Sequence, residues 1–129
     1  MENYYLEGTI KTPMIHFEYD TGNLTISGRS IPENSIDFYK GAMDWLDEYV
    51  KSPKPDTEFT VRLEYFNTSS SKCLVEIFRK LEGIYSDGNI VNVMWFYEEE
   101  DEDMMESGQD FGQIVKIPVK LIEEKSEEE

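Results

Sequence analysis

Along this chain, strand-like and helix-like hydrophobic patterns alternate, and that alternation constrains the fold more than any other feature. Apolar residues at every second position, or in short apolar runs, predict strands at 5–10, 14–19, 24–28, 58–65, 90–97 and 115–121. Spacings of three and four predict helices at about 34–50 and 71–85, with a weaker one at 98–112. Strands that alternate with helices need crossover connections. We therefore expect a single α/β domain: a mixed sheet of five to six strands with about three helices packed on it.

Individual residues sharpen these predictions. Asn34 is the expected N-cap of the first helix, whose core-facing stripe is predicted to be Ile36, Tyr39, Met43, Leu46 and Val50. Trp45 and Tyr49 lie off that stripe and either widen the buried face or are exposed. In 58–65 the predicted inward residues are Phe59, Val61, Leu63 and Tyr65. The nearly continuous apolar run 90–97 suits a central strand buried on both faces, and Pro118 favours an edge position for the last strand.

Acidic residues dominate the charge of the chain. Of 129 residues, 28 are Asp or Glu and 12 are Lys or Arg, which gives a formal net charge of −16. Such a surface repels nucleic acid and anionic membranes and favours a partner with a basic patch. Two clusters carry much of this charge, at 98–103 and 123–129. We expect the second to be a disordered tail that follows a folded domain of residues 1–122.

Few residues are suited to catalysis or to metal binding. Cys73 is the only cysteine and is expected to be a small core residue, and His16, the only histidine, has no accompanying nucleophile motif. The run 98–103 lacks the glycine and the ligand spacing of an EF-hand, and the chain has no glycine-rich phosphate loop. We expect no metal and no cofactor, and these residues favour no catalytic site. The absence of a signal peptide and of a long apolar run predicts a cytoplasmic protein.

The segment 65–72 is the most informative part of the sequence. Four consecutive hydroxyl residues, Thr68 to Ser71, lie where a predicted strand gives way to a predicted helix. At least one Ser or Thr is expected to cap the helix. A hydroxyl at a helix N-terminus also suits phosphorylation, because the free N–H groups and the helix dipole stabilise the added charge, and Lys72 lies nearby. These physical arguments do not select one hydroxyl.

Several separated segments resemble the SiaC family of bacterial regulatory phosphoproteins: Leu24–Asn34, Phe59–Ser71, Val93–Tyr97 and Asp101–Phe111. The resemblance covers roughly residues 5–122 and implies a fold similar to STAS domains and no catalysis by the protein itself. It implies that Thr68 is the phosphoacceptor, with a SiaB-like kinase and a SiaA-like phosphatase of the PP2C type as partners. It further implies that the unphosphorylated protein binds and activates a SiaD-like diguanylate cyclase and so raises cyclic di-GMP.

Partner contacts are expected on both sides of this segment. They are Asn67, Ser69 and Ser70 beside the phosphosite, and Arg29, Ser30, Pro32 and Glu33 in a loop expected to be exposed before the first helix. Two alternatives to this phosphorylation-controlled activator remain open at this point. One is an anti-sigma-factor antagonist in a partner-switching pathway, and the other is a small enzyme that uses His16 and carboxylates.

Overall fold

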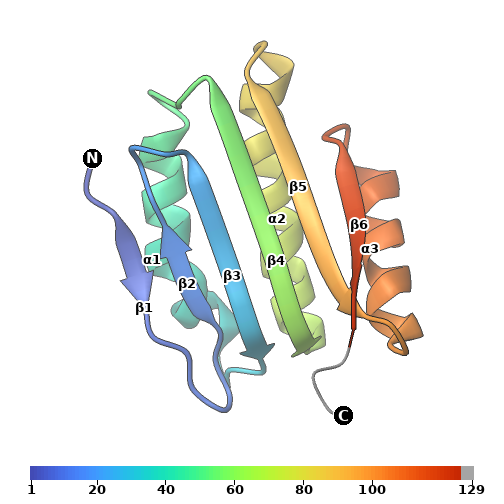
Figure 1. The fold of residues 1–129 in the computed structure, drawn as a ribbon. Helices are drawn as coiled ribbons and strands as arrows, with labels where there is room; N and C mark the ends of the chain where they lie inside the picture. Colours follow the sequence, from blue (N-terminus) through green and yellow to red (C-terminus); the bar gives the residue numbers. More distant parts are fainter. Residues whose placement is uncertain (126–129) are drawn as a thin grey trace.

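The computed structural model describes residues 1–125, and within them the strands and helices follow the predicted alternation (Figure 1). The bounds are β1 Tyr4–Leu6, β2 Met14–Phe17, β3 Asn23–Ser30, α1 Ser35–Tyr49, β4 Asp56–Phe66, α2 Thr68–Ser86, β5 Ile90–Glu98, α3 Glu102–Ile114 and β6 Val119–Glu124. One six-stranded sheet contains all the strands in the order of the chain, β1-β2-β3-β4-β5-β6. The first two pairings are antiparallel and the other three are parallel. The predicted α/β domain with a mixed sheet is therefore confirmed.

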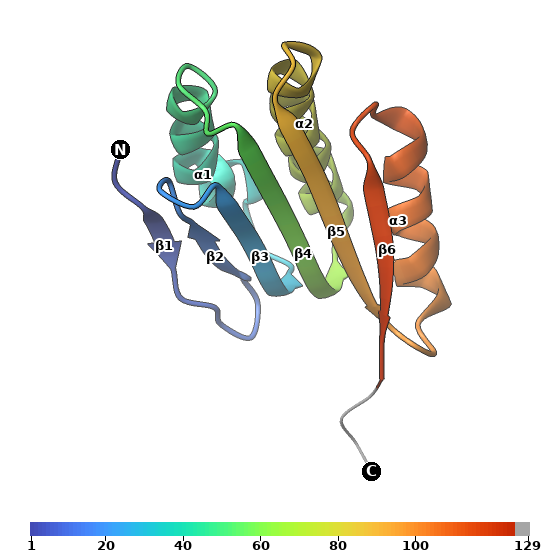
Figure 2. The ribbon, with the colours of Figure 1, turned by 45° about the horizontal axis from the view of Figure 1, so that its top comes forward.

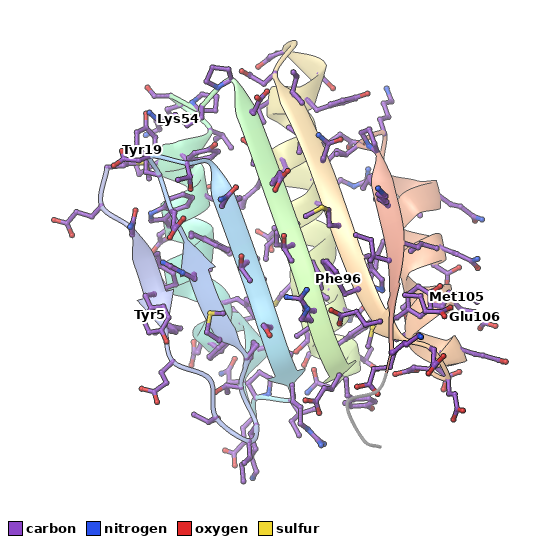
Figure 3. The ribbon with its side chains drawn as sticks, in the orientation of Figure 1. Tyr5, Tyr19, Lys54, Phe96, Met105 and Glu106 are labelled. Atoms are coloured by element: carbon purple, nitrogen blue, oxygen red, sulfur yellow. The ribbon has the colours of Figure 1, made fainter. Side chains whose placement is uncertain are left out.

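All three helices cover the same face of the sheet, so the domain has two layers (Figures 1 and 2). The core lies between them and is built from alternate residues of the strands, such as Phe59, Val61 and Trp95. Within residues 1–125 no helix or strand covers the opposite face of the sheet, on which Phe96 lies (Figure 3). This explains why β5 is not buried on both faces as predicted: Asn92 is exposed and Met94 is only half-buried.

The edge prediction for the last strand is confirmed, since β6 pairs only with β5. Pro118 lies just before β6, where its carbonyl oxygen accepts a hydrogen bond of 3.0 Å from the Val93 N–H. The strand includes Glu123 and Glu124, which the sequence interpretation assigned to the acidic tail, and Arg62 of β4 forms an ion pair of 3.1 Å with Glu124. The rest of the predicted tail, 126–129, lies outside the described residues.

The buried face of α1 differs from the predicted stripe. Ile36 is 78% exposed, whereas Trp45 and Tyr49 are buried. The two aromatic side chains cover more apolar surface than Ile36, and both satisfy their polar atoms. The Trp45 indole N–H donates to the Glu2 carbonyl oxygen at 2.7 Å, and the Tyr49 and Thr57 hydroxyls are 2.7 Å apart.

A register shift changes the end of β4. The pairing with β3 moves from Gly28 opposite Leu63 to Arg29 opposite Tyr65, so that Glu64 is an extra residue in β4. The extra residue reverses which side chains face the helices. Tyr65 was predicted to face the core but is 54% exposed, and Phe66 instead packs against the core.

Glycine allows α3 to approach the sheet closely. A Cβ at Gly108 would clash with the side chains of Trp95 and Leu121. The helix begins at Glu102, later than predicted, because the Asp101 side chain caps it by accepting a hydrogen bond of 3.0 Å from the Met104 N–H. The acidic run 98–103 therefore spans the end of β5, a turn and the first residues of α3.

Candidate functional site: the first turn of α2

The hydroxyl segment lies at the carboxyl ends of β3 and β4, where α1 and α2 begin (Figure 1). Ser30 ends β3 and Phe66 ends β4, and these two residues are paired. The next residue, Asn67, donates its backbone N–H to the Ser30 carbonyl oxygen at 3.0 Å, which continues the strand pairing by one step. The start of α2 is thereby held beside the end of β3.

Asn67 is the N-cap of α2. Its side-chain oxygen accepts hydrogen bonds from the Ser70 N–H at 2.9 Å and from the Ser69 hydroxyl at 3.2 Å. The helix consequently begins at Thr68 rather than at about Ser71, and the prediction that a Ser or Thr of this segment caps it is wrong. Asn caps a helix as well as Ser does, and Asn67 is the first residue after the strand.

Buried hydroxyl groups link the first turn of α2 to β3 and α1. The Ser30 hydroxyl lies 2.7 Å from that of Ser70 and 2.6 Å from that of Tyr39, and all three residues are fully buried. Burial raises the pKa of the Tyr39 phenol to about 12, against the opposing effect of its hydrogen bond to Ser30. The Ser35 hydroxyl lies 2.7 Å from that of Ser69. The network fixes where α1 and α2 begin relative to each other.

Thr68 differs from its neighbours. Its side chain is exposed, and within residues 1–125 no hydrogen bond involves its hydroxyl, whereas the hydroxyls of Ser69 and Ser70 are both bonded. Ser71 is half-buried. Thr68 is the first residue of a helix of 19 residues, where the dipole and the free N–H groups favour negative charge. Lys72, one turn further on, is exposed on the same side of the helix.

The other predicted contact residues divide into exposed and buried groups. Arg29 and Glu33 are exposed, but Arg29 belongs to β3 and not to a loop. Ser30, Pro32 and Ser70 are buried, so the expectation of an exposed loop is wrong for Ser30 and Pro32. Ser30 is buried because the tyrosine and serine hydroxyls described above surround it, and the Pro32 carbonyl oxygen accepts a hydrogen bond of 3.5 Å from the Asn67 amide.

Comparisons with known proteins identify the family. The family model of SiaC family regulatory phosphoproteins matches residues 6–124. The chain belongs to the SiaC family. A relative at 30% identity over 118 residues, 92% of this chain and 94% of its own length, is an uncharacterised protein of Pseudomonas aeruginosa strain UCBPP-PA14.

Solved structures of SiaC superpose closely on this chain. Apo-SiaC of P. aeruginosa is 29% identical, with a TM-score of 0.87 over 95% of this chain and 99% of that chain. A chain from the crystal structure of the diguanylate cyclase SiaD in complex with its activator SiaC, also from P. aeruginosa, is 29% identical. Its TM-score is 0.88 over 94% of this chain and 99% of that chain. The SiaC fold is thus shared over nearly the whole length.

Cys73 and His16, the other potentially reactive residues of this SiaC family member, lie away from the first turn of α2 or are buried beside it. Cys73 is buried, burial raises its thiol pKa, and its Sγ lies 3.8 Å from the Ser35 carbonyl oxygen. His16, on β2, lies 3.3 Å from the Glu18 carboxylate. Among the described residues, no three His, Cys, Asp or Glu side chains are grouped so as to hold a metal ion. None of the helices in this part of the chain is both long enough and apolar enough to cross a membrane.

Sequence reasoning missed three residues of the site. Ser35 and Tyr39 complete the hydroxyl network, and Ile36 presents an exposed apolar side chain in the first turn of α1. Ser35, which directly follows the predicted cap Asn34 as the first residue of α1, was a signal for the network. For Ile36 no signal existed, because its spacing matched the predicted buried stripe.

Proposed function

We propose that this chain is a cytoplasmic regulatory protein, without catalysis of its own, that binds and activates a diguanylate cyclase while Thr68 is unphosphorylated. Family membership supports a regulatory role, and a solved relative with 29% identity is the activator in a complex with the diguanylate cyclase SiaD. A SiaB-like kinase transfers the terminal phosphoryl group of ATP to the Thr68 oxygen and releases ADP. A SiaA-like phosphatase of the PP2C type hydrolyses the phosphoester.

The observation that carries this proposal is the exposed, unbonded hydroxyl of Thr68 at the first residue of α2. A kinase reaches this oxygen without breaking a hydrogen bond, whereas phosphorylation of Ser70 would require the buried network to open. Once formed, the phosphate lies within reach of the Lys72 ammonium group and of the first N–H groups of α2. The helix therefore stabilises the modified form without a change in fold.

Exposed residues around Thr68 form the surface that a cyclase meets. Ser69, Arg29 and Glu33 are exposed, and the adjacent first turn of α1 adds Ile36. An exposed apolar side chain offers a partner surface to remove from water, which favours binding. A phosphate among them must lose its water when a partner docks, and this desolvation opposes binding.

Two measurements test the proposal. The Thr68→Ala variant, incubated with the cognate kinase and ATP, is expected to gain no phosphate by mass spectrometry, whereas the control Ser69→Ala is expected to be modified like the wild type. Synthesis of cyclic di-GMP from GTP by the cognate cyclase is expected to rise with unphosphorylated protein and to stay basal with the phosphorylated form. Unchanged phosphorylation of Thr68→Ala refutes the site. Recovery of an anti-sigma-factor kinase instead of a cyclase in a pull-down refutes the partner.

A further inference from the structure

An apolar groove lies between α2 and α3, beside the end of α2 that carries Thr68. It has a volume of about 240 Å³ and is lined chiefly by Phe66, Ser71, Val75, Asp110, Phe111 and Ile114. We propose that this groove receives one large apolar side chain of a partner protein, next to a basic residue of the same partner, and that phosphate on Thr68 prevents this docking. The inference rests on the proposed function, because it names the surface through which phosphorylation acts.

The groove has the character of a side-chain pocket. Phe66 and Phe111 form part of its wall, with ring centroids 6.1 Å apart, and Ile114 on the rim is 45% exposed. Its volume is below the roughly 300–1,000 Å³ of small-molecule sites. A pocket of this size with aromatic walls suits the apolar anchor residues on which protein interfaces depend.

Thr68 stands at the outer margin of this groove. Thr68 and Val75 are seven residues apart, close to two helical turns, so both lie on the same side of α2, with Ser71 between them. The two helices both follow strands of the parallel part of the sheet and run in the same direction. Near the other end of the groove, the Arg79 guanidinium donates to the Ile114 carbonyl oxygen at 2.9 Å. A phosphate on Thr68 thus lies beside the entrance at the N-terminal ends of the helices.

Charge selects the flanking residue of the partner. Helix α3 contains four acidic residues and no Lys or Arg, and Asp103, Glu106 and Asp110 are exposed. This wall attracts an Arg or Lys placed one turn from the apolar anchor. The phosphate does not act by repelling that base. It prevents docking because the apolar anchor would have to displace water from a group that carries roughly −1.5 to −2 charge.

Peptide selection tests the groove without assuming a cyclase. A phage-displayed library of short random peptides is selected against the unphosphorylated full-length protein, and affinities of the selected peptides are measured by fluorescence anisotropy. We expect peptides with a large apolar residue one helical turn from Lys or Arg. Ile114→Glu is expected to weaken their binding about tenfold or more. Ile90→Glu, a matched control at an exposed isoleucine of β5, is expected to leave it unchanged.

Each outcome decides one part of the proposal. If no peptide is selected, or if selected peptides bind Ile114→Glu and the surface variant Asp110→Lys as tightly as wild type, the groove is not a docking site. If circular dichroism shows that Ile114→Glu is unfolded, peptide binding by Asp110→Lys alone decides whether the groove is a docking site. If Ile114→Glu and Asp110→Lys lose peptide binding but Thr68→Glu and the phosphorylated protein retain it, the groove is a docking site and control through Thr68 is refuted.

Discussion

Replacing Ser70 by Ala tests whether the buried hydroxyl network holds the site together. The Ser70 hydroxyl donates to the Ser30 carbonyl oxygen at 3.0 Å and lies 2.7 Å from the Ser30 hydroxyl. The substitution removes both interactions from a fully buried position, together with a longer contact of 3.4 Å between the Ser70 and Ser35 hydroxyls. Each buried hydrogen bond contributes about 0.5–1.5 kcal/mol.

The expected loss is partly offset within the network itself. The Ser30 hydroxyl keeps its contact with Tyr39, and the Ser30 carbonyl oxygen keeps the Asn67 N–H. Alanine also has a higher helix propensity than serine, by up to about 0.5 kcal/mol. We therefore expect the free energy of unfolding to fall by about 1–2 kcal/mol. For a chain of this length that corresponds to a fall in Tm of about 4–8 °C.

Ser71→Ala is the matched control. Ser71 is the next residue of the same helical turn and is half-buried, and within residues 1–125 no hydrogen bond involves its hydroxyl. The same change of residue type is expected to leave the Tm unchanged or to raise it slightly. Both variants are measured by thermal unfolding followed by circular dichroism at 222 nm. Equal shifts of the two variants contradict a stabilising role for the network.

Other predictions concern the cap, the helix packing and the pH dependence. Asn67→Ala is expected to lower the free energy of unfolding by about 1 kcal/mol in urea titrations, whereas Asn67→Asp, which keeps the capping acceptor and loses only the long contact with the Pro32 carbonyl oxygen, is expected to lower it less. Gly108→Ala is expected to lower the free energy of unfolding by about 1–3 kcal/mol, because the added Cβ clashes with side chains of the sheet. Gly83→Ala, at an open position of α2, is expected to raise it by about 0.5–1 kcal/mol. Equal effects of the two variants on Tm contradict the packing argument. The pKa of the Glu82 carboxyl is held below its usual 4.5, first by the backbone N–H that Lys116 donates at 2.6 Å. The ionised Glu82 carboxylate therefore stabilises the folded protein above pH 4.5, and this stabilisation is lost as the pH falls through the lowered pKa. Glu82→Gln is expected to lower the free energy of unfolding at about pH 7 and to leave it unchanged at about pH 2; an equal loss at both pH values refutes this.

Hydrophobic spacing was sufficient to predict the architecture but not the finer placement of side chains. The order of strands and helices follows from the two periods, and the edge position of the last strand from Pro118. The two-residue alternation of a strand does not reveal where a β-bulge inserts an extra residue such as Glu64, and for that reason the exposure of Tyr65 was missed. Nor does spacing weigh the area of competing side chains, which decides whether Ile36 or Trp45 faces the sheet.

The candidate site was predicted in place but not in detail. A row of hydroxyls between a strand and a helix indicated this segment, and the resemblance implied Thr68 as the phosphoacceptor, which stays a prediction. Which hydroxyl is buried depends on contacts between segments far apart in the sequence, such as Ser30 with Ser70, and no local pattern encodes them. The burial of Pro32 has the same origin, since the start of α2 packs against its loop.

The agreement between strand order and chain order has a consequence for how the domain folds. Each strand from β2 onward pairs with the strand that precedes it in the sequence. No strand has to insert between two strands already in place, and each new pairing closes a loop of one hairpin or one crossover helix. The entropic cost of closing a loop grows only slowly with its length, so the parallel pairings that follow a crossover helix carry no exceptional cost. The sheet can therefore grow outward during synthesis, and α3 and β6 join last and complete the groove beside Thr68.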